Sequence, residues 1–150
     1  MLYKSFSTLN EALKSGSTSC VEQVELYLKN IESKKDLNAF VEVFEEEALE
    51  KAKEIDAKIK AGSAGSLAGM VVGVKDNICY GGHKVTASSK ILEGFESLFT
   101  ATAVQRLLDQ DAIVIGRLSC DEFAMGSSNE KSVYGAVKNP HDTSRVPGGS

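Results

Sequence analysis

Two short apolar runs, at residues 70–74 and 112–116, constrain the fold of this chain more than any other feature. Each run is rich in β-branched side chains and contains or adjoins glycine, which is typical of strands buried on both faces of a sheet. Between them, residues 101–109 carry apolar side chains at helical spacing. A strand, a helix and a second strand in this order predict a crossover with two parallel strands, and therefore an α/β protein.

The residues before this region favour helices. Thr8 and Glu11 resemble a capping box, which predicts a helix over residues 8–15 that ends at a glycine. Ser19 and Glu22 repeat the signature at the start of a second helix. The apolar side chains of that second helix share one face, because their spacing follows the helical period: Val21, Val24, Leu28 and Ile31.

A brief strand or an extended link is predicted over residues 38–43, and a third helix follows it. The apolar positions of this third helix are Phe44, Ala48, Ala52, Ile55 and Ile59. The sequence GSAGSLAG at residues 62–69 breaks the helical pattern, and the composition then changes from charged to glycine-rich and β-branched. We therefore predict a helical N-terminal segment over residues 1–61 and the start of an α/β core over residues 62–150, together one incomplete domain.

Composition narrows the possible partners and compartments. The chain has a net charge of −4 and no long run of Lys and Arg, so we do not expect this segment to bind nucleic acid by itself. Its cysteines number 3 and are widely separated, which favours a reducing compartment over a disulfide framework. No stretch resembles a signal peptide or approaches the roughly 18 apolar residues of a membrane span. We expect a cytoplasmic protein.

Lys75 is the first candidate for chemistry, because it follows the apolar run at residues 70–74 directly. Its amine would therefore lie at the carboxyl end of a strand, where open α/β sheets place their ligand crevices. Burial favours the neutral form of a lysine, and a neutral amine can act as a base. Two alternatives stay open at this point: the side chain extends to solvent, or it pairs with Asp76.

The chain's last residues, PGGS at 147–150, combine backbone that can approach a small ligand closely with a hydroxyl at Ser150. An ordinary glycine turn is the alternative interpretation. Residues 121–130 form a second run of small residues, whose acidic side chains could cap a helix or stay solvated.

Other kinds of site have less support. A Ser-His-Asp triad would depend on His83 or His141, the only histidines, and neither has an obvious orienting acid. A thiolate pair of Cys79 with His83 lacks the surroundings of a known nucleophile. No glycine motif for nucleotide binding and no metal-ligand spacing occurs.

Four motifs together resemble the amidase signature family: GVKDN at 73–77, DEFAMGSS at 121–128, KNP at 138–140 and RVPGGS at 145–150. Four motifs in one order are more specific than any one of them, and the likeness covers essentially the whole chain. Within the family, the sequence is most similar to the A subunits of aspartyl/glutamyl-tRNA amidotransferases. The resemblance implies the family fold, a mixed central sheet flanked by helices, of which this chain would form the N-terminal part. Such a piece by itself would expose strand edges and apolar faces.

The resemblance also implies a Ser-Ser-Lys triad. Lys75 matches the family's catalytic lysine, the neutral base, and Ser150 matches the bridging serine that passes a proton from the nucleophile to the lysine. The nucleophilic serine belongs to a later glycine-rich motif, beyond residue 150. We therefore expect the 150-residue chain by itself to be inactive.

The function that the resemblance implies is hydrolysis of glutamine within a heterotrimer with B and C subunits. The released ammonia would convert Glu-tRNA(Gln) or Asp-tRNA(Asn) to the amidated form. ATP and Mg²⁺ would be used by a partner subunit, which would also make most tRNA contacts, and this chain would hold no cofactor or metal. The alternatives are a stand-alone amidase acting on another small amide, and a non-catalytic truncated relative that binds partner subunits.

Overall fold

The computed structural model describes residues 3–149, which form two compact units. Unit 1 contains the residues up to Ser33, Phe44–Val72 and Gln105–Ile115. Unit 2 contains Lys34–Val43, Gly73–Val104 and the residues from Gly116 onward. The division into residues 1–61 and 62–150 that was drawn from the sequence stays a prediction.

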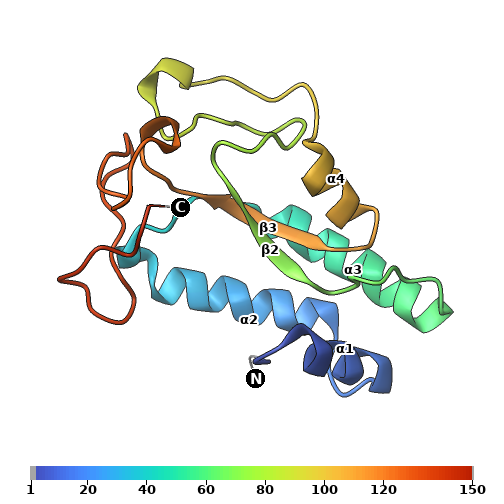
Figure 1. Cartoon of the computed structure of the whole chain (residues 1–150). Coiled ribbons are helices and arrows are strands. Elements are labelled where there is room, and N and C mark those ends of the chain that lie inside the picture. The colour runs from blue at the N-terminus through green and yellow to red at the C-terminus, as the bar shows by residue number, and fades with distance from the viewer. Residues whose placement is uncertain (1–2, 150) are drawn as a thin grey trace. The chain divides into compact units, whose positions relative to one another are not determined.

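Two helices begin the chain, and from the second helix onward α-helices and strands alternate (Figure 1). In order they are α1 (Phe6–Ser15), α2 (Cys20–Ser33), β1 (Phe40–Val43), α3 (Glu45–Ala61), β2 (Val71–Lys75), α4 (Thr102–Leu108) and β3 (Ile113–Leu118). The mixture of helices and strands confirms the predicted α/β class.

The strands form one sheet in the order β1-β3-β2, with β1 antiparallel to β3. The bonds between β2 and β3 advance in the same direction along both strands. At one end Ile113 N donates to Met70 O (2.8 Å), and at the other Asp76 N donates to Leu118 O (2.9 Å). This spacing is that of a parallel pair, so the predicted crossover through α4 is confirmed.

The two apolar runs differ in burial. All of β3 is buried except its last residue, as predicted. In β2 only Val74 is buried, and Val71 and Val72 are half-exposed, so the prediction of a strand buried on both faces is wrong there. The sheet order supplies the reason, because β3 lies between two neighbours whereas β2 has one on the described part of the chain.

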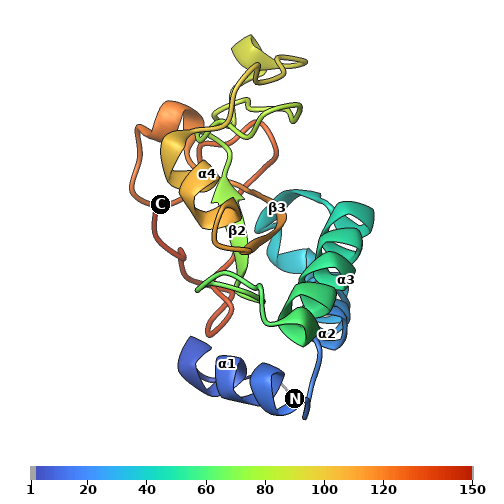
Figure 2. The same ribbon diagram turned by 90° about the vertical axis from the view of Figure 1, so that its right-hand side faces the viewer.

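Unit 1 is built on helix packing, and α2 lies against α3 (Figure 2). The capping box predicted for α2 is present: Glu22 N donates to Ser19 Oγ (3.1 Å) and Ser19 N donates to Glu22 Oε2 (3.2 Å). Asp56 of α3 adds to it, because its carboxylate accepts from Cys20 N at 2.7 Å and from the next amide at 3.2 Å. The amides at the start of a helix have no partner within the helix, so these bonds stabilise α2 and link it to α3.

The start of α1 differs from the prediction. Ser5, not Thr8, is the N-cap, and its Oγ accepts from Thr8 N (3.3 Å), so the helix begins two residues earlier than expected. Its end is as predicted, at Gly16, whose φ of 72° is the left-handed conformation that glycine adopts without steric cost.

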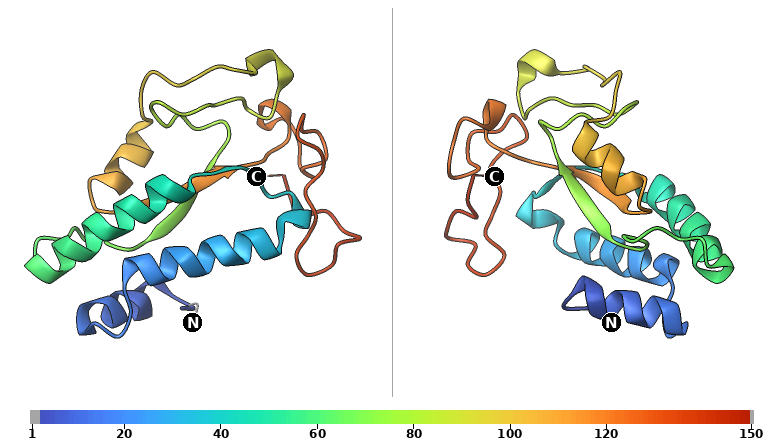
Figure 3. Two further views of the ribbon diagram at one scale, coloured as in Figure 1. Left: turned by 180° about the vertical axis from the view of Figure 1, so that it is seen from behind. Right: turned by 45° about the vertical axis from the view of Figure 1, so that its right-hand side comes forward.

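Unit 2 contains long irregular segments, at residues 76–101 and 119–149, which Figure 3 shows without long helices or strands. Buried polar side chains hold these segments. They are Asp76, Thr86, Ser88, Ser89, Ser97, Arg117, Ser119, Asp121 and Asn129.

Candidate functional site

Lys75 is the last residue of β2 and is half-buried, so it lies at the carboxyl end of a strand as predicted. The next residue, Asp76, is fully buried. Asp76 forms an ion pair with the guanidinium of Arg117, which also bonds Glu42 at 3.0 Å. The carboxylate that the sequence offered as a partner for Lys75 is thus bound to an arginine of β3.

The carboxylate of Asp76 also organises a buried turn. Its Oδ1 accepts from Thr86 N (3.0 Å), and its Oδ2 accepts from Thr86 Oγ1 (2.5 Å) and from Ser88 N (2.8 Å). Burial of the Arg117 side chain opposes its charge and acts to lower its pKa, but the hydrogen bond and the charge of Asp76, together with the hydrogen bond to Glu42, outweigh burial and raise the pKa of Arg117. The guanidinium of Arg117 is therefore charged at every ordinary pH.

The turn itself has an unusual backbone. Ala87 and Ser88 have φ values of 48° and 52°, in the left-handed region that costs side-chain-bearing residues of order 1–3 kcal/mol each. Bonds on both sides hold them there. Ala87 N donates to Asp76 O (2.8 Å), and Ala87 O accepts from Phe123 N (2.8 Å).

Ser88 connects this turn to residues 119–133. Its Oγ accepts from Cys120 N (3.1 Å), and its carbonyl accepts from Val133 N (3.0 Å). The neighbouring Ser89 Oγ donates to Glu122 Oε1 (2.6 Å). Both acids of the motif at residues 121–128 therefore have partners within the chain. Glu122 accepts from Ser89, and Asp121 accepts from backbone amides.

Asp121 is buried and accepts from the amides of Ser128 (3.2 Å), Asn129 (2.8 Å) and Lys131 (3.0 Å). Bonds from the amides of Lys131 and Asn129 hold the pKa of Asp121 below its usual value. A Cβ at Gly126 would overlap the same carboxylate, so only glycine allows this close approach.

The glycines near the end of the chain pack on this loop. A Cβ at Gly149 would lie 2.5 Å from Gly126 O and 2.5 Å from the Cα of Ser127. The close approach predicted for the PGGS backbone is therefore made, at Gly149, to the chain's own backbone. Ser150, the predicted bridging serine, lies outside the described residues.

The alternative nucleophile settings gain no support from the local geometry. The ring of His83 stacks on Tyr80, with centroids 4.1 Å apart, and its Nδ1 lies 3.0 Å from Gly81 O. His141 is exposed, and all three cysteines are free. Among residues 3–149, no group of three or more His, Cys, Asp or Glu side chains could hold a metal ion.

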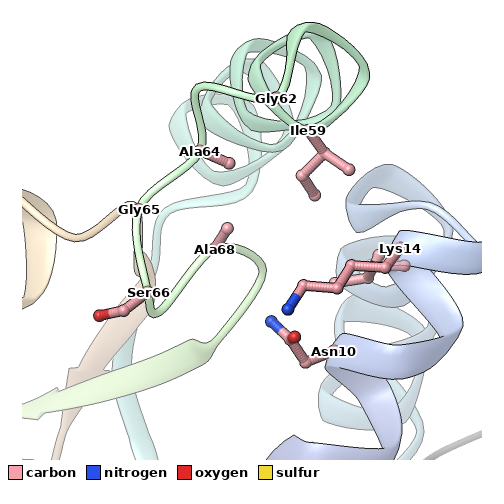
Figure 4. Close-up of a pocket in the computed structure, with 9 residues that line it drawn as sticks. Asn10, Lys14, Ile59, Gly62, Ala64, Gly65, Ser66 and Ala68 are labelled. Carbon is pink, nitrogen blue, oxygen red and sulfur yellow. The ribbon is translucent and has the colours of Figure 1, made fainter.

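A cavity of about 400 Å³ lies in unit 1, between α1 and the segment after α3. Figure 4 shows the polar ends of Asn10 and Lys14 close together on its α1 side, whereas the hydroxyl of Ser66 points away. Ser66 Oγ donates to Gln110 Oε1 (2.8 Å) instead. Lys75 is not among the residues that line this cavity, so it is separate from the candidate catalytic residues.

Sequence reasoning found Lys75 but missed the network beside it. Asp76, Thr86, Ser88 and Arg117 are brought together only by the fold. The local signal was weak, since a Lys-Asp pair and a Thr-Ala-Ser-Ser run are common in loops. Within the part of the chain that the structure describes, no helix is both long and apolar enough to cross a bilayer.

Comparison with known proteins gives consistent results. The family model named Amidase matches residues 22–150. The chain is 48% identical to the A subunit of glutamyl-tRNA(Gln) amidotransferase from Chlorobaculum parvum, over 100% of this chain and 31% of that protein. It therefore spans about a third of the length of this relative.

Solved structures show the same fold. A native peptide amidase from Stenotrophomonas maltophilia superposes with a TM-score of 0.88 at 28% identity, over 98% of this chain and 32% of the other. The A subunit of glutamyl-tRNA(Gln) amidotransferase from Thermotoga maritima superposes with a TM-score of 0.74 at 32% identity, over 100% of this chain and 31% of the other. These matches confirm that the chain has the N-terminal part of the amidase signature fold.

Proposed function

This chain belongs to the Amidase family, and we propose that the complete protein is the glutamine-hydrolysing subunit of a tRNA-dependent amidotransferase. The identity of 48% to the A subunit of a glutamyl-tRNA(Gln) amidotransferase, over the whole of this chain, carries the proposal. The ammonia released from glutamine converts Glu-tRNA(Gln) or Asp-tRNA(Asn) to the amidated form.

The reaction proceeds through an acyl-enzyme. A serine beyond residue 150 attacks the side-chain amide carbon of glutamine, and its proton passes through Ser150 to the neutral amine of Lys75. The carbon–nitrogen bond breaks as the proton returns to the leaving nitrogen, which departs as ammonia. Water then hydrolyses the ester to glutamate by the same proton route. The position of Lys75 at the end of β2 supports its role as the base.

The partners follow from the same proposal. B and C subunits complete a heterotrimer, and the tRNA is contacted mainly through a partner. ATP and Mg²⁺ activate the tRNA-linked carboxylate in that partner, and this chain's own residues act only on glutamine. The complex works in the cytoplasm.

The test is ammonia release from glutamine by the complete protein carrying Lys75→Ala. Loss of a positioned general base lowers kcat by about 10²- to 10⁴-fold, so we expect a fall within that range. Lys90→Ala is the matched control, because Lys90 is an exposed lysine of unit 2. Undiminished ammonia release by Lys75→Ala, with the control also active, would remove Lys75 from the mechanism.

A stand-alone amidase is a second candidate. One observation favours it: the peptide amidase superposes with a TM-score of 0.88, against 0.74 for the amidotransferase protein. A panel of glutamine, peptide amides and aryl amides separates the two, since higher kcat/KM for the other amides than for glutamine supports this candidate.

A further inference from the structure

We infer that Asp76 is a positioning residue, which fixes Lys75 relative to the loop that Gly149 packs against. The inference rests on the proposed function, since it assumes that Lys75 is the base. It is carried by the contacts of Asp76, all of which lie within unit 2.

Asp76 is held at both its backbone and its side chain. Its amide donates to Leu118 O (2.9 Å) and its carbonyl accepts from Ala87 N (2.8 Å). Its carboxylate accepts four hydrogen bonds, from Thr86 N, Thr86 Oγ1, Ser88 N and the Arg117 guanidinium. Lys75 is covalently joined to a residue with this many restraints, so the end of β2 has little freedom to move.

The same carboxylate cannot serve as the base or the nucleophile. Asp76 has no exposed surface, and its oxygens are occupied by donors from three residues. A group that touches neither solvent nor substrate acts on the reaction only through its neighbours. Its role is therefore to position Lys75.

A continuous series of contacts leads from Asp76 to the end of the chain. Ser88, bound by Asp76, accepts from the amide of Cys120. The next residue, Asp121, holds the loop at residues 126–131, and Gly149 packs on Gly126 and Ser127. Two buried carboxylates, Asp76 and Asp121, thus link the segment that carries Lys75 with the segment that precedes Ser150.

Asp76→Asn is the variant that tests this inference, measured in the complete protein at a temperature where it is folded. The substitution keeps the size of the side chain and removes its charge. Small displacements of a catalytic group cost about 10²-fold, so we expect kcat for ammonia release to fall by roughly that factor. The KM for glutamine stays within about twofold, because Asp76 does not touch substrate.

Asp111→Asn is the matched control. Asp111 is a buried carboxylate of unit 1 that accepts from Lys58 Nζ (2.7 Å) and Gly65 N (2.7 Å). Because this carboxylate has only a structural role, Asp111→Asn should lower the melting temperature and leave kcat per folded molecule unchanged. The same pattern in Asp76→Asn, with a lower melting temperature and unchanged kcat, would overturn the inference.

Thr86→Val covers the case in which Asp76→Asn does not fold. It removes the hydroxyl that donates to Asp76 at 2.5 Å, which also lies 2.9 Å from the hydroxyl of Tyr134, and leaves the pair with Arg117 in place. We expect a smaller fall in kcat, about fivefold, the equivalent of one hydrogen bond, with KM unchanged. No fall in kcat in a folded Thr86→Val protein overturns the inference.

The two proposals fail differently. If Lys75→Ala leaves ammonia release intact, the role of Lys75 in the proposed function is wrong. If Lys75→Ala removes activity while Asp76→Asn and Thr86→Val retain full kcat, only the positioning role is wrong.

Discussion

The two units differ in the side chains that fill their interiors. Unit 1 closes its core with apolar side chains of its helices and of β3, such as Val24, Ile55 and Ile113, which have no exposed surface. Unit 2 also buries apolar side chains, and it adds the buried ion pair of Asp76 and Arg117. Among residues 3–149, every large apolar side chain that is exposed belongs to unit 2: Val43, Ile78, Ile91, Phe95, Leu98, Phe99, Phe123, Met125, Val133, Tyr134 and Val146.

Apolar burial and buried polar networks make different contributions to a fold: the first mainly stabilises it, and the second mainly fixes its geometry. Burying an aliphatic side chain contributes about 1.5–3 kcal/mol and demands little of its exact direction. A buried charge contributes to a stable fold only when each of its partners is in place, and such a network defines one geometry. Unit 2, which carries Lys75, is therefore the unit whose geometry depends on particular hydrogen bonds.

The largest effect is expected for Arg117→Met, which would leave Asp76 buried without its counter-charge. Breaking a buried ion pair from one side costs roughly 4 kcal/mol. Hydrogen exchange of the backbone amides in the complete protein measures this as a lower opening free energy for unit 2. The double variant Asp76→Asn/Arg117→Met should recover part of the loss. A loss below about 1 kcal/mol in the single variant would contradict the role given to the network.

Ile55→Ala makes the corresponding change in unit 1. Ile55 is fully buried on α3, and its truncation leaves a cavity that costs roughly 3 kcal/mol. The opening free energy of unit 1 amides should fall by that amount in the same exchange experiment. Ile55→Val is the control, at about 1 kcal/mol. Equal costs for the two variants would mean that packing at this position does not stabilise unit 1.

Ser19→Ala tests the capping of α2. It removes the hydroxyl that accepts from Glu22 N at 3.1 Å, and loss of an N-cap costs about 1 kcal/mol. Exchange of the first amides of α2 should report it. Asp56 continues to accept from Cys20 N, so a loss well above about 2 kcal/mol would show that Ser19 does more than cap the helix.

The smallest effect is expected from acid titration of Asp121, whose contribution to stability is present at neutral pH and is lost only in acid. Its pKa lies below the ordinary value of 3.8, so the folded state favours the charged form. The stability that it contributes is fully present above that value and is lost as the pH falls through the lowered pKa. Protection of the amides at residues 126–131 should therefore decrease below about pH 3.8. In Asp121→Asn that protection should be low at all pH values, and an unchanged acid response would contradict the assignment.

Sequence patterns predicted the features that depend on neighbours along the chain. The capping box of Ser19 and Glu22 is local, and the structure has both of its bonds. The start of α1 was misplaced because Ser5 and Thr8 are both capping residues ahead of the same apolar pattern. Only the extended backbone of Ser5, with φ of −145°, decides between them.

Features that depend on position in the sheet or on distant residues were not predictable. The runs at residues 70–74 and 112–116 look alike, yet within residues 3–149 one strand is central and the other has a single neighbour. The position of Lys75 at a strand end followed from the pattern. Its neighbour Asp76 pairs with Arg117, 41 residues further along the chain, and nothing local signals such a contact.

The left-handed turn at Ala87 and Ser88 has a consequence for sequence variation. Glycine and asparagine are favoured at a position with φ near +50°, whereas β-branched residues are poorly accommodated there. The bond from Phe123 N to Ala87 O uses only the backbone, so glycine at position 87 would preserve it. Libraries randomised at these two positions should therefore return a narrow set of small residues, although neither position is a candidate catalytic residue.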